Sequence, residues 1–248
     1  MIIAVASSPG VGKTHWIHQQ IAQINRPVGY FSPQADSLSI DAIYLQSEYP
    51  KLKLYQKGEE AELNKTITYL EIPWYLDLAK IETLLQSLNP HRVAIIPSDT
   101  DNSELKTWAD EIIPGNKIVK QNKNLQIHRG VLTGEILDFG SLATFWLELT
   151  QGAYGEVVRA KGIFDLADGQ IYYGDFIPGK SALEFKPLNL PRWPNGKPDR
   201  KSGFEIVGSN LDKAEIDQTV RDCCVPESAI NYYQQQVKES LVTELELV

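Results

Sequence analysis

Residues 2–14, IIAVASSPGVGKT, decide the fold of the first half of the chain. They begin with a continuous apolar run, Ile2–Ala6, of the kind that forms a strand buried on both faces. A short loop of small residues follows, and then Ile17, Ile21 and Ile24 recur at helical spacing. A buried strand, a tight loop and an amphipathic helix in this order predict the opening of an α/β domain.

The loop inside this stretch, Ser7–Thr14, fits a phosphate-binding pattern. Walker A loops follow G-x-x-x-x-G-K-[ST] between a strand and a helix, and every position fits here except the first, where Ser7 replaces glycine. Small residues let successive backbone N–H groups surround an anion, and the next helix adds the positive end of its dipole. The residues expected to contact a nucleotide are Ser8, Gly10, Val11, Gly12, Lys13 and Thr14.

Two side chains of this loop carry the predicted chemistry. Lys13 would bridge the β- and γ-phosphates as a catalytic residue, and the Thr14 hydroxyl would hold Mg²⁺. The alternative is a tight strand-to-helix turn with an incidental Lys-Thr pair. Ser7 is the main support for that alternative, because a Cβ at the turn is strained if its φ is positive.

The rest of the first half alternates strands with helices. Arg92–Ile96 is another apolar strand, and Leu76–Leu88 is a helix with one apolar face. This alternation predicts a parallel sheet with right-handed crossovers. The other expected elements are strands at Pro27–Phe31, Asp41–Gln46 and Thr66–Ile72, a surface loop or short helix at Lys57–Asn64, and a helix at Glu104–Ile113 that Pro114-Gly115 ends.

The second half has an α+β pattern with an antiparallel sheet. Strands at Val157–Leu166 and Gln170–Phe176 are joined by Asp168-Gly169, a strong hairpin signal. The polar stretch Lys120–Asn124 is expected to separate a shortened nucleotide-binding domain, residues 1–124, from a second domain, residues 125–248. The other expected elements are a buried helix at Leu142–Leu149, strands at Leu183–Pro187 and Phe204–Val207, a helix at Leu211–Cys223 capped by Asn210 or Ser209, and a final helix near Glu227–Leu247.

Composition and charge exclude several classes of protein. The chain has 248 residues, of which 42% are hydrophobic and 23% charged, as expected for a globular protein of one or two domains. A net charge of −8 argues against a nucleic-acid partner. Residues 1–125 carry 12 Lys and Arg against 14 Asp and Glu, and are therefore the better place for a phosphate ligand. No apolar run approaches the about 18 residues of a membrane span, and no signal peptide is evident, so we expect a cytoplasmic protein without a membrane partner.

Cysteine and histidine give little support to a metal site. Cys223 and Cys224 are the only cysteines, and adjacent cysteines rarely pair, so a disulfide framework and a Cys-rich zinc site are both excluded. His15 and His18 lie at a helical spacing that can share one metal ion, but no third ligand is evident nearby. We therefore favour surface or interface histidines and a packed thiol beside a more exposed one.

Basic side chains of the second half have no assigned chemistry. Arg159 and Lys161 alternate with apolar residues, so they share one face of a strand and form either a contact surface or an exposed sheet face. Arg192 and Arg200 lie with Trp193 in a Pro- and Gly-rich loop. A solvated loop is the favoured interpretation, and contact with an acidic partner or a phosphate is the alternative.

Two segments of the second half resemble the C-terminal domain of the CobW-type GTPases. They are Val157–Phe164, which contains an R-x-K-G strand, and Phe204–Asp212, where a strand leads into a G-x-x-L-D turn. The order of the two halves, with the phosphate loop first, also matches that family. The resemblance implies a P-loop NTPase domain with a parallel sheet, followed by an α+β CobW C-terminal-like domain with an antiparallel sheet.

The resemblance also implies two acids near the nucleotide. Glu71, in the segment 71–74, would act in catalysis as a water-positioning or metal-side acid, with a strand-end carboxylate in solvent as the alternative. Asp101, in the segment 98–101, would read the guanine base, with a helix N-cap or solvated turn acid as the alternative. The C-x-C-C metal motif of the family has no counterpart, because no cysteine precedes Cys223.

These features together predict a GTP-binding protein that resembles the CobW-type GTPases and metallochaperones. Mg²⁺–GTP would bind at the phosphate loop, and slow hydrolysis would control the docking of a client metalloprotein or another protein. The alternative is a non-catalytic assembly protein that acts through the second domain, which the departures at Ser7, Trp74 and Ser98 favour. Kinase-like phosphoryl transfer is less favoured, because no arginine cluster follows Thr14.

Overall fold

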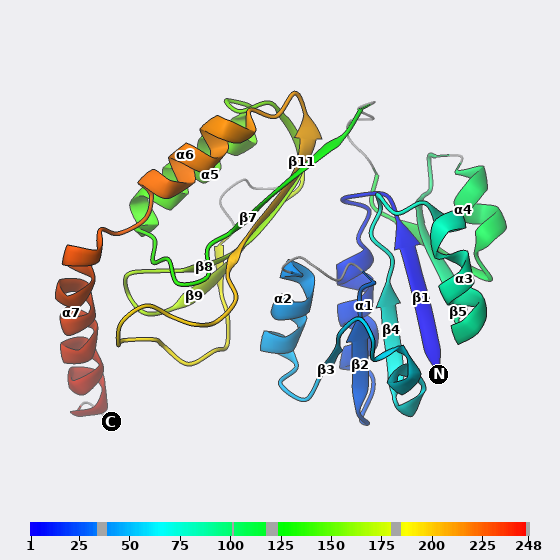
Figure 1. Cartoon of the computed structure of the whole chain (residues 1–248), viewed down its shortest axis with the longest axis horizontal. Coiled ribbons are helices and arrows are strands. Elements are labelled where there is room, and N and C mark those ends of the chain that lie inside the picture. Colours follow the sequence, from blue (N-terminus) through cyan, green and yellow to red (C-terminus); the bar gives the residue numbers. More distant parts are fainter. Residues whose placement is uncertain (34–38, 101, 118–123, 180–184, 247–248) are drawn as a thin grey trace. The chain divides into compact units, whose positions relative to one another are not determined.

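The computed structural model describes residues 1–33, 39–100, 102–117, 124–179 and 185–246, with side chains up to Ser240. The chain divides into two compact units, Met1–Lys120 and Gln121–Val248. Each unit has its own sheet and its own hydrophobic core, so each is described by itself (Figure 1).

The first unit is built on a six-stranded sheet in the order β3-β2-β4-β1-β5-β6. All neighbouring strands pair in parallel, which confirms the predicted parallel sheet. The strand β1 lies between β4 and β5 and is buried on both faces, which explains its continuous apolar sequence. The strands are β1 Ile2–Ser7, β2 Val28–Phe31, β3 Lys53–Tyr55, β4 Ile67–Glu71, β5 His91–Pro97 and β6 Glu111–Gly115.

Helices cover both faces of this sheet. On one face, Ile17 of α1 and Leu45 of α2 join a core with β-strand residues, and on the other face Leu85 of α3 and Leu105 of α4 do the same (Figure 1). The helices are α1 Lys13–Ala22, α2 Ile40–Glu48, α3 Leu78–Leu88, α4 Ser103–Trp108 and the 3-10 helix η1 Glu60–Lys65.

Two predicted elements of the first unit are wrong. The segment Asp41–Gln46 belongs to helix α2 rather than a strand, because Ser39 caps the helix through Ala42 N. The predicted helix Glu104–Ile113 ends at Trp108, and the following residues form β6, which pairs with β5. Pro114 is tolerated there because β6 is the last strand in the sheet order and needs fewer ladder hydrogen bonds.

The second unit contains a five-stranded antiparallel sheet in the order β10-β9-β8-β11-β7, which confirms the predicted sheet type. The hairpin between β8 and β9 turns at Gly169, whose φ is +78°. Sequence reasoning did not predict β7. The strands are β7 Gln126–Val131, β8 Glu156–Asp165, β9 Ile171–Phe176, β10 Phe185–Pro187 and β11 Gly203–Ser209.

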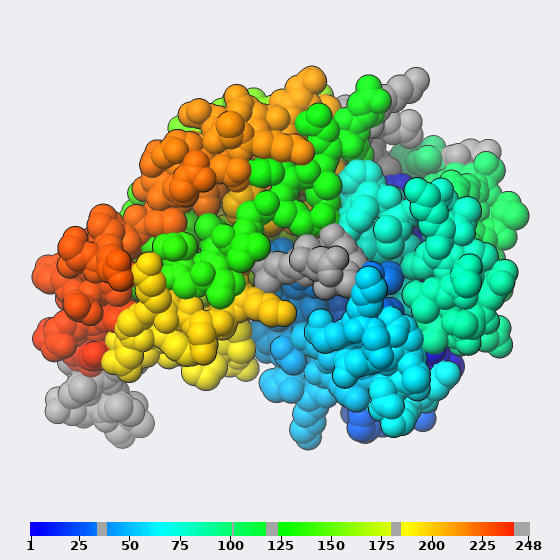
Figure 2. All heavy atoms as spheres, in the orientation of Figure 1, coloured from blue at the N-terminus to red at the C-terminus, as the bar shows by residue number. Residues whose placement is uncertain are grey.

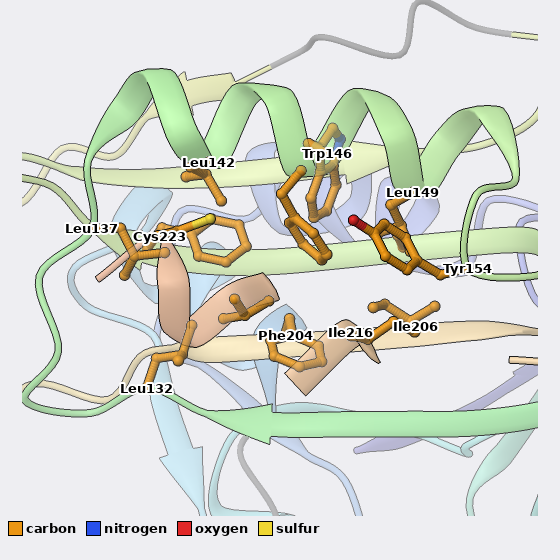
Figure 3. Close-up of a cluster of buried hydrophobic side chains, with 14 of the residues drawn as sticks. Leu132, Leu137, Leu142, Trp146, Leu149, Tyr154, Phe204, Ile206, Ile216 and Cys223 are labelled. Carbon is orange, nitrogen blue, oxygen red and sulfur yellow. The ribbon is translucent and has the colours of Figure 1, made fainter. Parts of the chain in front are cut away.

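Two helices pack on this antiparallel sheet, α5 Phe139–Gln151 and α6 Lys213–Asp222. Figure 3 shows Trp146 of α5 above Phe204 of β11 in the core of the second unit. The outer face of α6 lies at the surface (orange in Figure 2). The predicted caps of α6 are wrong, since Asp212 accepts the hydrogen bond from Glu215 N. The last helix is α7 Glu227–Glu246.

Candidate functional site

The predicted phosphate loop joins β1 to α1, as its sequence requires. Gly10 and Gly12 have φ values of +78° and +116°, which glycine adopts without strain. Ser7 is the last residue of β1, pairs with Ile95 of β5, and has no positive φ. Serine therefore replaces the glycine of the pattern at this position without the strain that a left-handed turn would cause.

The N-terminus of α1 offers backbone donors to a ligand. Gly12 is the N-cap of the helix and provides no side-chain hydrogen bond to the first turn, which contains no acidic residue. The first N–H groups of a helix have no acceptor within the helix. These groups and the helix dipole together form a site that favours an anion.

Lys13 reaches from this loop to the end of β4. Its Nζ donates to the carbonyl oxygen of Ile72 at 2.6 Å and lies 3.3 Å from Oε1 of Glu71. The pairing of Val5 with Glu71 in the parallel sheet brings this acid beside the loop. Glu71 is only 6% exposed, so the alternative of a strand-end carboxylate in solvent is wrong.

Tyr30 of β2 holds the other oxygen of Glu71. Its hydroxyl donates to Oε2 at 2.6 Å, in a buried part of the first unit. Burial, followed by the nearby charges of Glu71 and Asp41, raises the pKa of Tyr30 well above its ordinary value. The phenol therefore stays protonated and keeps donating, and Glu71 is fixed by Tyr30 on one oxygen and by Lys13 on the other.

Thr14 meets a second acid on α2. Its Oγ1 donates to Oδ1 of Asp41 at 3.0 Å. Sequence reasoning missed Asp41 because it assigned this segment to a strand. The signal that could have found it is Ser39 followed by Asp41, since a serine cap with an acid in the first turn is typical of a helix start.

The oxygen atoms around the loop fit a magnesium ion. Thr14, Asp41 and Glu71 offer one hydroxyl and two carboxylates, and Mg²⁺ prefers oxygen ligands from one or two carboxylates together with phosphates and water. Within the described ranges, no group of three or more His, Cys, Asp or Glu residues could hold a metal ion. One hydroxyl and two carboxylates are the kinds of donor that Mg²⁺ uses together with phosphate oxygens and water.

The structure describes some of the other predicted site residues and leaves one of them undescribed. Ser8 follows β1 within the loop, and Val11 is buried, with its carbonyl oxygen accepting a hydrogen bond. Asp101 lies outside the described residues. His18 lies 3.8 Å from Glu48 and stacks on Tyr44, consistent with a surface role.

The two cysteines have the properties of packed thiols. Burial raises the pKa of Cys223 to about 12 and that of Cys224 to about 11. The Sγ of Cys223 donates to the carbonyl oxygen of Thr219 at 3.1 Å. Metal binding and nucleophilic attack both need the thiolate, which such pKa values disfavour.

The basic side chains of the second unit have structural partners. Arg159 and Lys161 are buried, so the alternative of an exposed sheet face is wrong, and Arg159 pairs with Asp175. The interpretation of a solvated loop is wrong for Arg200, which donates to Oδ1 of Asp165 at 2.6 Å and to the carbonyl oxygen of Pro191 at 2.7 Å. Arg200 therefore fastens this loop to the β8–β9 hairpin.

A hollow of about 450 Å³ in the second unit is lined by residues of α5, α7 and the β8–β9 turn. Its two acids are engaged in local hydrogen bonds. Asp138 caps α5 through Ser141 N, and Asp168 accepts from Gln170 N. The hollow therefore has less chemistry to offer than the loop of the first unit, which remains the candidate site.

Comparison with protein families gives a match in the second unit. Residues 138–224 match the family described as the cobalamin synthesis protein cobW C-terminal domain. The resemblance that the sequence suggested is therefore confirmed for this part of the chain, which carries a CobW-type C-terminal domain. No curated protein matches the chain in sequence.

Two solved structures are similar to the chain at a low level. They are the Zn(II)-bound YjiA GTPase from E. coli and a Zn(II)-bound triple mutant of YjiA GTPase. Each is 10% identical, with 90% of this chain and 98% of the other covered, at a TM-score of 0.31. A TM-score of this size carries no argument about this chain. In the described part of the chain, no helix is long and apolar enough to cross a membrane.

Proposed function

We propose that the chain binds a magnesium–nucleoside triphosphate at its phosphate loop and acts as a slow GTPase. The observation that carries the proposal is that Lys13 pairs with Glu71, and Thr14 with Asp41, beside the N-terminus of α1. The CobW-type C-terminal domain supports GTP as the nucleotide, since the family that the sequence resembles consists of GTPases.

Lys13 changes partners when a nucleotide binds. In the resting chain its ammonium is hydrogen-bonded to Ile72 and paired with Glu71, so the phosphates must replace both contacts. Because Tyr30 still holds Oε2, Glu71 keeps its place when Lys13 leaves, and its Oε1 becomes available to orient a water molecule.

Thr14 would hold the cation through its Oγ1. Its Oγ1 uses its proton on Asp41, which leaves its lone pairs for the ion. When bound, Mg²⁺ would neutralise charge on the β- and γ-phosphate oxygens. Asp41 thereby fixes the orientation of the Thr14 hydroxyl, and it adds a second negative charge beside the place where the cation would be held.

Hydrolysis is expected to be slow. A catalytic arginine supplies about 10³-fold or more of the rate in such enzymes. Arg26 and Arg92 are the arginines of residues 1–120, and Arg92 is engaged by Glu82 at 2.7 Å. The nucleotide state would then act as a timer for the docking of a client metalloprotein or another protein in the cytoplasm.

The test compares the native chain with Lys13→Ala. Mg²⁺–GTP binding is measured by titration calorimetry, and turnover by release of the γ-phosphate. Loss of one charge-assisted contact to a phosphate should lower affinity by about 10-fold or more. The control is Lys57→Ala, an exposed lysine in another loop, which should bind as the native chain does. Equal affinities for both variants would contradict the site.

A non-catalytic binding protein remains the second candidate. The observation in its favour is that Lys13 is already held by Ile72 and Glu71, so the loop is internally satisfied without a ligand. Multiple turnovers of Mg²⁺–GTP by the native chain, abolished in Lys13→Ala, would exclude it. Tight binding without phosphate release would favour it.

A further inference from the structure

The hollow of the second unit has a chemistry that the proposed function does not use. Its volume of about 450 Å³ lies within the range of small ligand sites, about 300–1,000 Å³. Phe139, Tyr172 and Tyr233 supply aromatic rings to its lining, and Asp138 and Asp168 supply carboxylates. None of the described residues that line it is basic. The lining is therefore aromatic and negatively charged.

The aromatic rings of the hollow are open to solvent. Phe139, at the start of α5, contacts Tyr172 of β9 with 6.0 Å between the ring centroids. Phe139 is 48% exposed, and Tyr233 of α7 is 38% exposed. The face of an aromatic ring carries negative charge density and attracts a cation that lies over it. Exposed rings beside two carboxylates therefore suit an organic cation, which is attracted by both kinds of group.

The two carboxylates are held in place by neutral donors. Asp138 accepts hydrogen bonds from the backbone N and the hydroxyl of Ser141, and Asp168 accepts from Gln170 N. Neutral donors position a carboxylate but do not cancel its charge. Burial, followed by the charge of Asp168, raises the pKa of Tyr172, which shows that this carboxylate acts on a ring of the hollow.

The charge around the hollow also favours a basic partner. Residues 126–248 carry 12 Lys and Arg against 18 Asp and Glu. Arg192 opposes the rise in the pKa of Tyr172, but it is not among the residues that line the hollow. An excess of negative charge accelerates the encounter with a positively charged surface. Among basic side chains, arginine fits best, because its planar guanidinium stacks on rings and donates in a fork to carboxylates.

We propose that the hollow is the docking site for an arginine side chain of a partner protein. The guanidinium stacks on the rings of Phe139 and Tyr233 and donates to Asp138 or Asp168. The partner's main chain covers the exposed rings, which a small free cation would leave in water, and aromatic residues and arginine are enriched in protein interfaces. This inference goes beyond the proposed function and is independent of it, because the phosphate loop belongs to the first unit.

The experiment compares two blocked tripeptides, acetyl-Gly-Arg-Gly-amide and its citrulline analogue, which has nearly the same shape without the charge. Binding to the full chain is followed by NMR of isotope-labelled Phe and Tyr side chains. The arginine peptide should bind about 5- to 10-fold more tightly. It should also shift the ring signals of Phe139 and Tyr233, which are assigned by their loss in Phe139→Leu and Tyr233→Leu. Equal affinities for the two peptides would overturn the proposal.

The acids are tested by Asp138→Asn and Asp168→Asn. Both variants keep a side-chain oxygen for the cap and the turn, because asparagine serves these positions as well as aspartate does. Each should weaken the arginine peptide about 2- to 5-fold and leave the citrulline peptide unchanged. The control is Asp199→Asn, the same change at an exposed position outside the lining. Native affinity for the arginine peptide in both test variants would contradict the site.

The rings and the source of the cation are tested separately. Phe139→Leu keeps an apolar side chain but removes the ring face, so it should weaken the arginine peptide about 2-fold or more. Tyr232→Leu, at an exposed ring that does not line the hollow, is the control. Methylguanidinium is the same cation without a peptide and should bind more weakly than the arginine peptide. Equal binding of these two ligands would indicate a site for a free cation and overturn the docking proposal.

Discussion

At the scale of single residues, the hydrogen bond from Tyr30 fixes the position of the Glu71 carboxylate beside the phosphate loop. Tyr30→Phe keeps the buried ring and removes the 2.6 Å hydrogen bond to Glu71. Because a buried hydrogen bond to a charged group contributes about 1.5–3 kcal/mol, we expect the free energy of unfolding to fall by about 2 kcal/mol. Urea denaturation measures this change.

The control for Tyr30 is Tyr69, its partner in the pairing of β2 with β4. Tyr69 is also buried, and burial raises its pKa to about 12, but among the described residues its hydroxyl has no hydrogen bond to a carboxylate. Tyr69→Phe should therefore lower the free energy of unfolding by less than Tyr30→Phe does. Equal losses from the two substitutions would show that the Tyr30–Glu71 bond has no special weight.

The thiols give a second prediction at this scale. A pKa of about 11 for Cys224, against an ordinary value of 9.0, lowers its thiolate fraction about 100-fold at pH 8. Alkylation by iodoacetamide, followed by mass spectrometry, should therefore be slow in the native chain and fast in denaturant. Rapid modification of the native protein at pH 8 would show that the thiols are more accessible than their packing indicates.

At the scale of elements, Asp212 determines where α6 begins. Its side chain accepts from Glu215 N, so Asp212→Ala leaves a donor of the first turn without its cap. We expect a loss of about 1 kcal/mol in the free energy of unfolding. The control is Lys213→Ala at the next, exposed position, which should change stability little. A cap at Asn210 or Ser209 would leave Asp212→Ala without effect.

The Arg200–Asp165 pair predicts a pH-dependent loss of stability. Burial raises the pKa of Asp165, and the charge of Arg200 opposes that rise. A carboxyl with a raised pKa binds its proton more tightly in the folded state, so its ionisation opposes folding as pH increases through that pKa. Arg200→Met leaves the buried carboxylate of Asp165 without its partner. The free energy of unfolding should therefore fall by about 3 kcal/mol at pH 8.

The substitution should lower the free energy of unfolding by less at pH 5 than at pH 8, because the raised pKa of Asp165 favours its protonation as the pH falls and so lessens the uncompensated charge. Thermal unfolding at the two pH values measures the difference. Lys201→Met, which removes an exposed neighbouring charge, is the control and should show little dependence on pH. A loss of equal size at both pH values would contradict the assigned role of Asp165.

The elements also show where sequence reasoning succeeds and where it fails. The apolar run Ile2–Ala6 predicts its strand because a buried central strand needs no polar alternation. The residues of β6 do not form a continuous apolar run. They form a strand rather than the predicted helix because they pair with β5. The wrong prediction of a strand at Asp41–Gln46 had a larger effect on the predicted site. Asp41 comes beside Thr14 only when its segment is helical, so the strand prediction hid this contact.

The candidate site was predictable in its local part and not in its long-range part. The order of Ser7–Thr14 in the sequence is enough to predict the loop, since the strand, turn and helix are consecutive. The Tyr30–Glu71 hydrogen bond joins residues of two neighbouring strands that are 41 positions apart. Such a contact depends on strand order, which hydrophobic periodicity does not specify.

At the scale of the whole molecule, the two units should respond differently to a ligand. Each unit has its own core, so a nucleotide that binds the first unit stabilises that unit. At a concentration 100 times its dissociation constant, Mg²⁺–GTP should raise the free energy of unfolding of the first unit by about 2.7 kcal/mol. Calorimetry should then show one transition rising by several degrees, and hydrogen exchange should assign that transition to residues 1–117. An unchanged first unit would contradict the proposed site.

The ion pair between Lys13 and Glu71 also bears on which anions the resting chain attracts. Because its ammonium is already paired with a carboxylate 3.3 Å away, Lys13 adds little positive field to that of the α1 N-terminus. Orthophosphate, which is plentiful in cells, would have to displace an internal counter-ion while bringing no cation to compensate it. A magnesium polyphosphate must displace the same contacts, but it brings a cation that compensates the released carboxylate, so the loop should disfavour orthophosphate more than its proposed ligand.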